Sequence, residues 1–259
     1  AEGVAVASVG PLDLRRGRVV RPANLPFEQL ELVGPLEEEL GKPVLLVNDA
    51  VAAAWGERVR GAARGCDNVV YVTLSTGIGV GAVVDGRLLT GKDGNAHEAG
   101  HVVVDYRSRI RCGCGGVGHW EALASGSGIP RYASYLASTS YRRLLARSRL
   151  ARLIERGELT PEDLFEAARL GDELARAIVD ELGRVNAAGV ASVVNVYDPE
   201  VVVLGGAIAL NNPDLVVPPI DRYMSEYLIN RRPRLVLAEL GDDAGLIGAL
   251  SLVFGGSRR

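Results

Sequence analysis

The sequence predicts an α/β fold, and the spacing of its apolar residues supports this class. Short and mostly apolar runs, typical of buried strands, recur at residues 44–47, 69–74 and 201–204. Each run ends at a glycine or a small polar residue, and stretches with helical periodicity separate the runs. Because strands alternate with helices along the chain, the expected architecture is a sheet covered by helices.

The individual elements follow from the same patterns. A turn-rich segment is expected at 13–26, and the residues Thr160-Pro161-Glu162-Asp163 form a strong helix start. The expected strands cover residues 4–9, 44–47, 69–74, 79–84, 87–89, 102–105, 201–204 and 235–240. The expected helices cover residues 28–40, 50–59, much of 129–195, 213–228 and 244–254.

Composition and charge exclude several classes of protein. The 259 residues carry a net charge of −3, so nucleic acid is not an expected partner. No apolar run approaches the length of a membrane span, no signal peptide opens the chain, and three cysteines cannot form a disulfide framework. We therefore expect a cytoplasmic protein. The scarcity of Met, Gln and Lys predicts a thermophilic source, although Arg enrichment also follows genomic base composition.

A carboxylate stands at the junction between the strand at 44–47 and the helix at 50–59. Asp49 follows the strand at the position where open α/β sheets bind ligands. Asp is also a preferred N-cap residue, so the same position fits a purely structural role. The sequence leaves both roles open for Asp49, and a helix cap and a catalytic group do not exclude each other.

Two glycine-containing turns follow predicted strands. Residues 74–81 read Leu-Ser-Thr-Gly-Ile-Gly-Val-Gly, and the N–H groups and the Thr76 hydroxyl of such a turn suit phosphate oxygens. The turn does not open a helix, so it is neither a P-loop nor a dinucleotide fingerprint, and a plain tight hairpin is the alternative. The second turn, Gly205-Gly206-Ala207, either passes under an adenine ring or packs a helix closely.

A compact segment combines cysteine, histidine and glycine. Cys112, Cys114 and His119 lie within eight positions, and His101 lies eleven residues before Cys112. Four nitrogen and sulfur ligands fit a closed tetrahedral zinc site, and the glycines allow a short loop to fold around the metal. In a cytosolic chain Cys-x-Cys favours metal over a disulfide, although it is not the commonest zinc spacing. Cys66 has no nearby partner and is expected to fill apolar space.

In this order, the motifs resemble the ROK family of sugar kinases and repressors. The resemblance extends from Gly10 to Ala249, and residues 198–206 also match closely. Its most specific parts are Asn48-Asp49 before the Ala-rich helix, Ser75-Thr76-Gly77-Ile78-Gly79, Glu98-Ala99-Gly100-His101, and the segment 112–121.

The resemblance implies an actin-like (ribonuclease H-like) ATPase fold with two lobes. Residues 1–51 together with 245–259 would form the small lobe. Residues 52–244 would form the large lobe, with the zinc-binding loop and the nucleotide-binding elements.

The resemblance also implies a role for each matching residue. Asp49 would be the catalytic base, and ATP, Mg²⁺ and a structural Zn²⁺ ion would be the cofactors. His101 would give one ring nitrogen to zinc and the other to the sugar. The implied ligands are Asn48, Glu98, His101 and Glu121 for the sugar; Ser75, Thr76, Gly77, Gly205, Gly206 and Ala207 for ATP; and His101, Cys112, Cys114 and His119 for zinc.

The chain departs from the family pattern in three places. An Asp-x-Gly-x-Thr turn that contacts ATP phosphates in the family is absent from these 259 residues, so we expect the sequence to lack an N-terminal segment. His119 stands where the family has a third cysteine, and zinc accepts either ligand. Val51 replaces the Asn that usually follows the catalytic Asp by two residues, and Ser75 replaces the first glycine of the phosphate turn.

The expected function is ATP-dependent phosphorylation of glucose at its 6-hydroxyl, or of a broader set of hexoses. The alternatives are the sugar-sensing effector domain of a ROK-type transcriptional repressor and an N-acetylmannosamine kinase domain. Asp49 favours a kinase, because a pure sensor has no chemical need for a base at that position. A hexose and ATP are the expected partners, and the resemblance suggests a homodimer.

Overall fold

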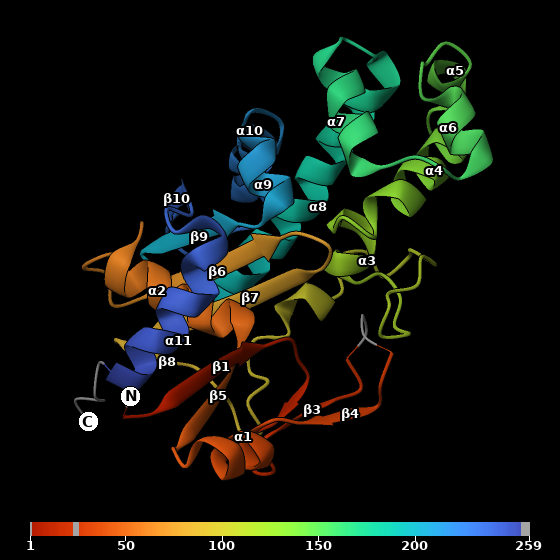
Figure 1. Ribbon diagram of the computed structural model, residues 1–259. Helices are drawn as coiled ribbons and strands as arrows, with labels where there is room; N and C mark the ends of the chain where they lie inside the picture. The colour runs from red at the N-terminus through yellow and green to blue at the C-terminus, as the bar shows by residue number, and fades with distance from the viewer. Residues whose placement is uncertain (1, 23–25, 255–259) are drawn as a thin grey trace.

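The computed structural model describes residues 2–22 and 26–254 (Figure 1). Within this part of the chain, no helix combines the length and the apolar character that crossing a bilayer requires. The strands are β1 Val4–Ser8, β2 Leu12–Asp13, β3 Arg18–Val20, β4 Gln29–Glu31, β5 Val44–Asn48, β6 Val69–Leu74, β7 Ile78–Val84, β8 Arg87–Leu88, β9 Val201–Gly205 and β10 Arg234–Leu237. The α-helices are α1 Val33–Leu40, α2 Asp49–Arg60, α3 Trp120–Ala124, α4 Ile129–Thr139, α5 Arg142–Leu145, α6 Ala151–Arg156, α7 Pro161–Arg169, α8 Glu173–Tyr197, α9 Ala207–Asn211, α10 Pro213–Tyr223 and α11 Ala244–Phe254.

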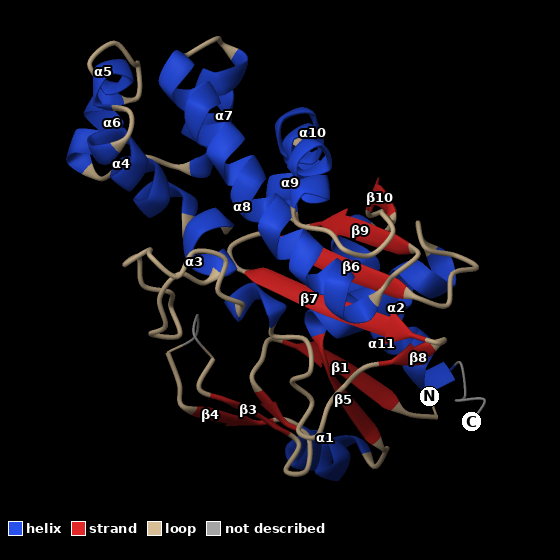
Figure 2. Ribbon diagram, turned by 180° about the vertical axis from the view of Figure 1, so that it is seen from behind, coloured by secondary structure: helices blue, strands red, loops and turns tan. Residues whose placement is uncertain are grey.

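The centre of the molecule is a mixed five-stranded sheet in the order β10-β9-β6-β7-β8 (Figure 2). The strands β10, β9 and β6 are parallel, and β7 returns antiparallel to β6. Side chains of β6 alternate between two cores, as the pleat of a strand requires. Val70 and Val72 pack in the core that contains α8, whereas Val69 and Tyr71 pack in the core that contains α2. Helices therefore cover both faces of the sheet, which confirms the predicted α/β class.

Helices α2 and α11 cross at very short range. A Cβ added to Gly248 would lie 1.7 Å from the carbonyl oxygen of Ala52, and one added to Gly56 would lie 2.5 Å from that of Ala244. Only glycine permits such a close backbone approach. The crossing fixes α2, whose first residue is Asp49, against the C-terminal helix.

A smaller layer lies beyond these two helices (Figure 2). In it, β1 and β5 pair in parallel, with Ser8 opposite Asn48, and β2, β3 and β4 form an antiparallel sheet. Leu12 and Val19 of this sheet pack with Leu46 of β5 in a separate apolar cluster. The carboxyl end of β5 thus delivers Asn48 and Asp49 to the space between the two layers.

Two predicted elements were wrong. The predicted helix at 28–40 begins only at Val33, because residues 29–31 pair with β3 as β4, and Arg18 donates across this ladder to Gln29 and Glu31. The predicted strand at 102–105 does not form, and Val103 makes only an isolated bridge to His119. The predicted turn segment 13–26 contains β3, and its residues 23–25 lie outside the described part of the chain.

Candidate active site

A cleft of about 620 Å³ opens beside the carboxyl end of β5. Most of the residues that the sequence predicts for the sugar and phosphate sites line this one cleft, although they come from distant parts of the chain. These lining residues are Asn48, Asp49, Ser75, Thr76, Gly77, Glu98, His101 and Glu121. The predicted nucleotide residues Gly205, Gly206 and Ala207 are not among its lining residues.

Asn48 and Asp49 divide the two roles that the sequence left open. Asn48 is the N-cap of α2, and its Oδ1 accepts hydrogen bonds from the N–H groups of Ala50 and Val51, at 2.9 and 3.2 Å. Asp49 occupies the first helical position, and its Oδ1 accepts from Ala50 at 2.7 Å. The carboxylate is therefore not needed as the cap and is open to the cleft.

The surroundings of Asp49 change its acidity. The cleft walls limit its hydration, and this desolvation raises the pKa of the Asp49 carboxyl above its ordinary value. The N–H of Ala50 and the nearby His97 oppose this effect and lower the pKa, but they do not cancel it. A carboxylate with a raised pKa is a stronger base, which suits a group that accepts a proton.

The loop that carries Glu98 is fixed to the smaller layer. The Asn95 side chain both accepts from the N–H of Leu12 and donates to its carbonyl, each at 2.7 Å. His97 is buried, lines the cleft, and donates from Nε2 to the carbonyl of Gly94 at 2.7 Å. A Cβ added to Gly10 would lie 2.9 Å from Glu98 Oε1 and 3.5 Å from Asn48 Nδ2, so these polar groups converge above Gly10.

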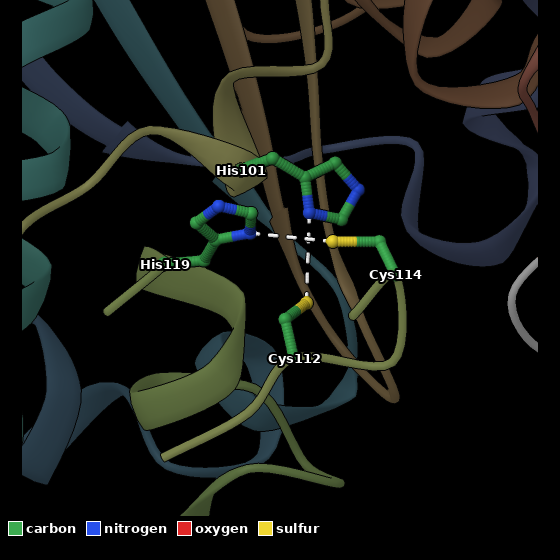
Figure 3. A group of neighbouring side chains, drawn as sticks. All are labelled: His101, Cys112, Cys114 and His119. Atoms are coloured by element: carbon green, nitrogen blue, oxygen red, sulfur yellow. Dashed lines mark hydrogen bonds between the residues drawn. The ribbon is translucent and has the colours of Figure 1, made fainter. Parts of the chain in front are cut away.

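The predicted metal ligands lie together around one point (Figure 3). The ligand atoms of His101, Cys112, Cys114 and His119 all lie within 4.8 Å of one another. His101 Nδ1 is 3.6 Å from Cys112 Sγ, and His119 Nδ1 is 3.4 Å from Cys114 Sγ. Ligands of a tetrahedral zinc ion with ordinary bond lengths are separated by about 3.6 Å.

His101 presents its two ring nitrogens to different sites. Nδ1 points to the centre of the metal-ligand cluster (Figure 3). Nε2 lies 3.5 Å from Glu98 Oε2, and both residues line the cleft. Burial lowers the pKa of His119, which keeps that imidazole neutral and able to bind a metal. Burial also raises the pKa of the Cys112 thiol to about 12, so a metal would have to displace its proton.

Glu121 connects the metal-ligand cluster with the phosphate turn. It lies in the first turn of α3, and its Oε2 accepts from the N–H of Ile78 at 2.9 Å. Its Oε1 lies 3.3 Å from Cys112 Sγ. Helix α3 is held firmly, because Trp120 is fully buried and donates from Nε1 to Asn186 of α8 at 2.7 Å.

The predicted phosphate turn joins β6 and β7 and lines the same cleft. Within the described residues, no hydrogen bond uses the N–H groups of Thr76 and Gly77. Two free N–H groups in a turn make a site for an anion. Gly206 lies beside the same strand end, because β9 pairs with β6 and a Cβ added to Gly206 would lie 2.6 Å from Thr73 Oγ1.

Sequence reasoning assigned no role to two titratable residues of the cleft. His97 directly precedes the Glu98-Ala99-Gly100-His101 motif, and Arg21 lies in the predicted turn-rich segment. Arg21 is the only Arg or Lys among the described residues that line the cleft, and its backbone adopts a left-handed φ of 47°. Its N–H donates to the carbonyl of Glu28 at 2.7 Å. No short motif predicts either position, because both depend on where a loop is folded.

The fold and the cleft together define a class of protein, the actin-like (ribonuclease H-like) ATPases. The model of the ROK family matches residues 1–255, and the chain belongs to the ROK family. The match covers all of the described residues, including the segment with the four Cys and His side chains.

Individual relatives agree with this assignment. A glucokinase of Pyrobaculum calidifontis is 43% identical over 253 residues, which cover 98% of this chain and 79% of that protein. A crystal structure of the ROK hexokinase from Thermus thermophilus superposes with a TM-score of 0.82 at 38% identity, over 96% of this chain and 77% of that one. A ROK family glucokinase from Streptomyces griseus, solved with glucose and AMPPNP, superposes with a TM-score of 0.79 at 35% identity. The superposition covers 97% of this chain and 81% of that one.

Proposed function

We propose that this chain transfers the terminal phosphoryl group of ATP to the 6-hydroxyl of a hexose, with glucose as the favoured substrate. One observation carries the proposal: Asp49, whose pKa is raised by desolvation, lines the same cleft as Glu98, His101, Glu121 and the turn of Ser75, Thr76 and Gly77. The similarity to glucokinases, at 43% identity over nearly the whole chain, supports glucose as the substrate.

Asp49 would act as the general base. A sugar hydroxyl is a poor nucleophile, so a carboxylate within hydrogen-bond reach accepts its proton as the oxygen attacks the γ-phosphorus. The new O–P bond forms while the bond from the γ-phosphorus to the bridging oxygen breaks, and ADP leaves. Because only the ionised carboxylate accepts a proton, turnover should fall as the pH drops through the raised pKa of Asp49.

The polar groups around Gly10 would orient the sugar. Glu98 and Glu121 offer carboxylate oxygens, each of which accepts from a hydroxyl, and the Asn48 amide has a free Nδ2 donor because its Oδ1 caps α2. His101 Nε2 faces the same space beside Glu98. These groups together match a ligand with many hydroxyls in fixed positions.

The nucleotide would lie on the other side of the cleft. The free N–H groups of Thr76 and Gly77 would hold phosphate oxygens, and Gly206 with Gly205 and Ala207 would lie next to the adenosine. Mg²⁺ would neutralise charge on the phosphates during transfer. Arg21 is the cationic side chain of the cleft and is available to the transferred phosphoryl group.

We also propose that the metal-ligand cluster holds zinc. Two sulfurs and two imidazole nitrogens are the donor set that zinc prefers, and their measured separations fit a tetrahedral ion. Zinc bound there would leave no open position and would fix the His101 ring, so that Nε2 faces the sugar. We propose a small lobe of residues 1–51 and 245–259, of which 1, 23–25 and 255–259 lie outside the described residues, and a large lobe of 52–244.

A coupled assay of ADP release tests the function. The protein expressed from its complete open reading frame should release ADP with glucose, and mannose, fructose, glucosamine and N-acetylmannosamine should define its range. Asp49→Asn should lower kcat by about 1000-fold while sugar binding is largely kept, because the base is lost but the shape of the cleft remains. Asp214→Asn is the matched control, since Asp214 lies on α10 in an exposed ion pair with Arg169.

Two outcomes would contradict the proposal. If Asp49→Asn retained turnover, Asp49 would not be the base. If the protein expressed from its complete open reading frame bound glucose in calorimetry but released no ADP with any sugar, the cleft would be a sugar sensor of the repressor type.

A further inference from the structure

The connection between α3 and α4 is bonded directly to the phosphate turn. The N–H of Gly126 donates to the carbonyl of Ser75 at 2.7 Å. Ser127 makes two hydrogen bonds to the carbonyl of Thr76, one from its N–H at 3.1 Å and one from its Oγ at 2.9 Å. Together with Glu121, which accepts from Ile78, one short stretch of chain holds the turn along its whole length.

These hydrogen bonds decide which way the turn faces. A peptide unit has its C=O and N–H on opposite sides, so fixing the carbonyls of Ser75 and Thr76 turns the following N–H groups away from the connection. Those are the N–H groups of Thr76 and Gly77, which have no partner among the described residues. The connection thus sets the direction of the anion-binding donors.

The connection itself has little freedom to move. Ser125 is fully buried, and its Oγ accepts from the N–H of Gly128 at 3.0 Å. A Cβ added to Gly126 would lie 3.0 Å from the carbonyl oxygen of Ser75, so the two backbones are already in close contact. Behind the connection, α3 is anchored to α8 through the buried Trp120.

We propose that Ser127 is a positioning residue for ATP: together with Gly126 it holds the phosphate turn with its free N–H groups directed at the nucleotide. The inference rests on the proposed function, because it identifies the anion as the phosphate chain of ATP. Ser127 itself does not react, and acts only through the Thr76 carbonyl. Its hydroxyl donates to this carbonyl, and its own oxygen lies 3.1 Å from the Ser125 hydroxyl.

The test compares the effect of each variant on ATP binding with its effect on glucose binding. Ser127→Ala removes one of the two hydrogen bonds to Thr76 and should raise KM for ATP by about threefold to tenfold, with KM for glucose within twofold of wild type. Titration of AMPPNP by calorimetry should show the same loss of affinity, and this measurement needs no turnover. Ser127→Thr should restore both values, because it keeps the hydroxyl. Gly126→Ala should weaken AMPPNP binding as well, because its Cβ presses on the Ser75 carbonyl.

Ser138→Ala is the matched control, since this exposed serine of α4 only donates to the carbonyl of Tyr135 in its own helix. The proposal is overturned if Ser127→Ala leaves AMPPNP affinity within twofold of wild type, or if Thr fails to restore it. An equal rise of both KM values with a lower melting temperature would also overturn it, since that indicates a general structural role. A protein expressed from the complete open reading frame that binds AMPPNP but phosphorylates no sugar would refute the proposed function, whereas the AMPPNP affinities of the Ser127 variants would still decide this inference.

Discussion

The two walls of the cleft are built in different ways. The wall that carries Asp49 is regular: β5 ends at Asn48 and α2 begins at Asp49, so ladder and helix hydrogen bonds fix the carboxylate. The opposite wall, residues 97–119, has almost no regular structure beyond one 3₁₀ turn at Ala99–His101. There His101, Cys112, Cys114 and His119 converge through their side chains.

This difference predicts which part of the site would depend on the proposed zinc ion. Backbone hydrogen bonds hold Asp49 without any bound group. A loop of irregular structure has only weak local preferences, and a closed metal site supplies folding free energy to such segments. We therefore expect loss of the metal to disorder the wall formed by residues 97–119 and to leave the wall that carries Asp49 intact.

Among changes to the irregular wall, removal of a metal ligand should have the largest effect. Cys112→Ala leaves three ligands and should abolish stoichiometric zinc, which metal analysis of the purified protein measures. Because His101 would lose its fixed orientation, KM for glucose should rise by about tenfold to a hundredfold. The melting temperature should fall as the loop loses its restraint.

Cys66→Ala provides the matched control, because Cys66 is buried but lies outside the metal-ligand cluster. It should keep one equivalent of zinc and a normal KM for glucose. A Cys112→Ala protein with full zinc content would show that these four residues do not form the metal site.

A smaller change to the same wall should have a smaller effect. A Cβ added to Gly116 would lie 2.3 Å from Cε1 of His119, so Gly116→Ala must displace that imidazole. We expect weaker zinc binding, seen as faster loss of metal to a chelator, with a melting temperature between those of wild type and Cys112→Ala. Gly34→Ala on α1, where an added Cβ meets nothing within 4 Å, should leave zinc retention unchanged. If Gly116→Ala and Gly34→Ala lost zinc to the chelator at the same rate, Gly116 would not be in close contact with the His119 ring.

The regular wall and the grouping of the four Cys and His side chains were largely predictable from the sequence. Asp49 follows a buried strand directly, and Cys-x-Cys near two histidines is a pattern that favours metal binding. The division of roles between Asn48 and Asp49 was not predictable, because both residue types cap helices and only the backbone conformation selects one. The metal, base and phosphate residues came from sequence motifs, yet their convergence on one cleft required the fold.

The contribution of loops was beyond sequence reasoning. His97 reaches the cleft only because Asn95 is bonded to Leu12, which is 83 residues distant in the chain. Ser127 belongs to an inconspicuous Ser-Gly-Ser-Gly stretch, and its role depends on a contact with Thr76, 51 residues earlier. The failed strand at 102–105 has the same origin, since its neighbours are drawn into the metal-ligand cluster instead of a sheet.

The regular wall can be tested at Asn48. Asn48→Ala removes the cap of α2 and the amide donor, and should cost about 1 kcal/mol of stability as well as sugar affinity. Asn48→Ser restores a good cap but no amide donor. Its melting temperature should therefore stay near that of wild type, whereas KM for glucose should rise as in Asn48→Ala. If the Ser variant recovered both properties, Asn48 would act only as a cap.

The smallest expected effect concerns the stability cost of the ionised base. The carboxyl of an unfolded Asp has a pKa near 3.8. Folded Asp49 keeps its proton to a higher pH, because the cleft desolvates the carboxylate. The protonated Asp49 carboxyl therefore stabilises the folded state fully below pH 3.8, and this stabilisation is lost as the pH rises through the pKa of folded Asp49. Calorimetry should show Asp49→Asn melting slightly above wild type at pH 7, with the difference vanishing in acid. Asp214→Asn should melt slightly lower at pH 7, because Arg169 lowers the pKa of Asp214. Shifts of the same sign in both variants would contradict a desolvated base at position 49.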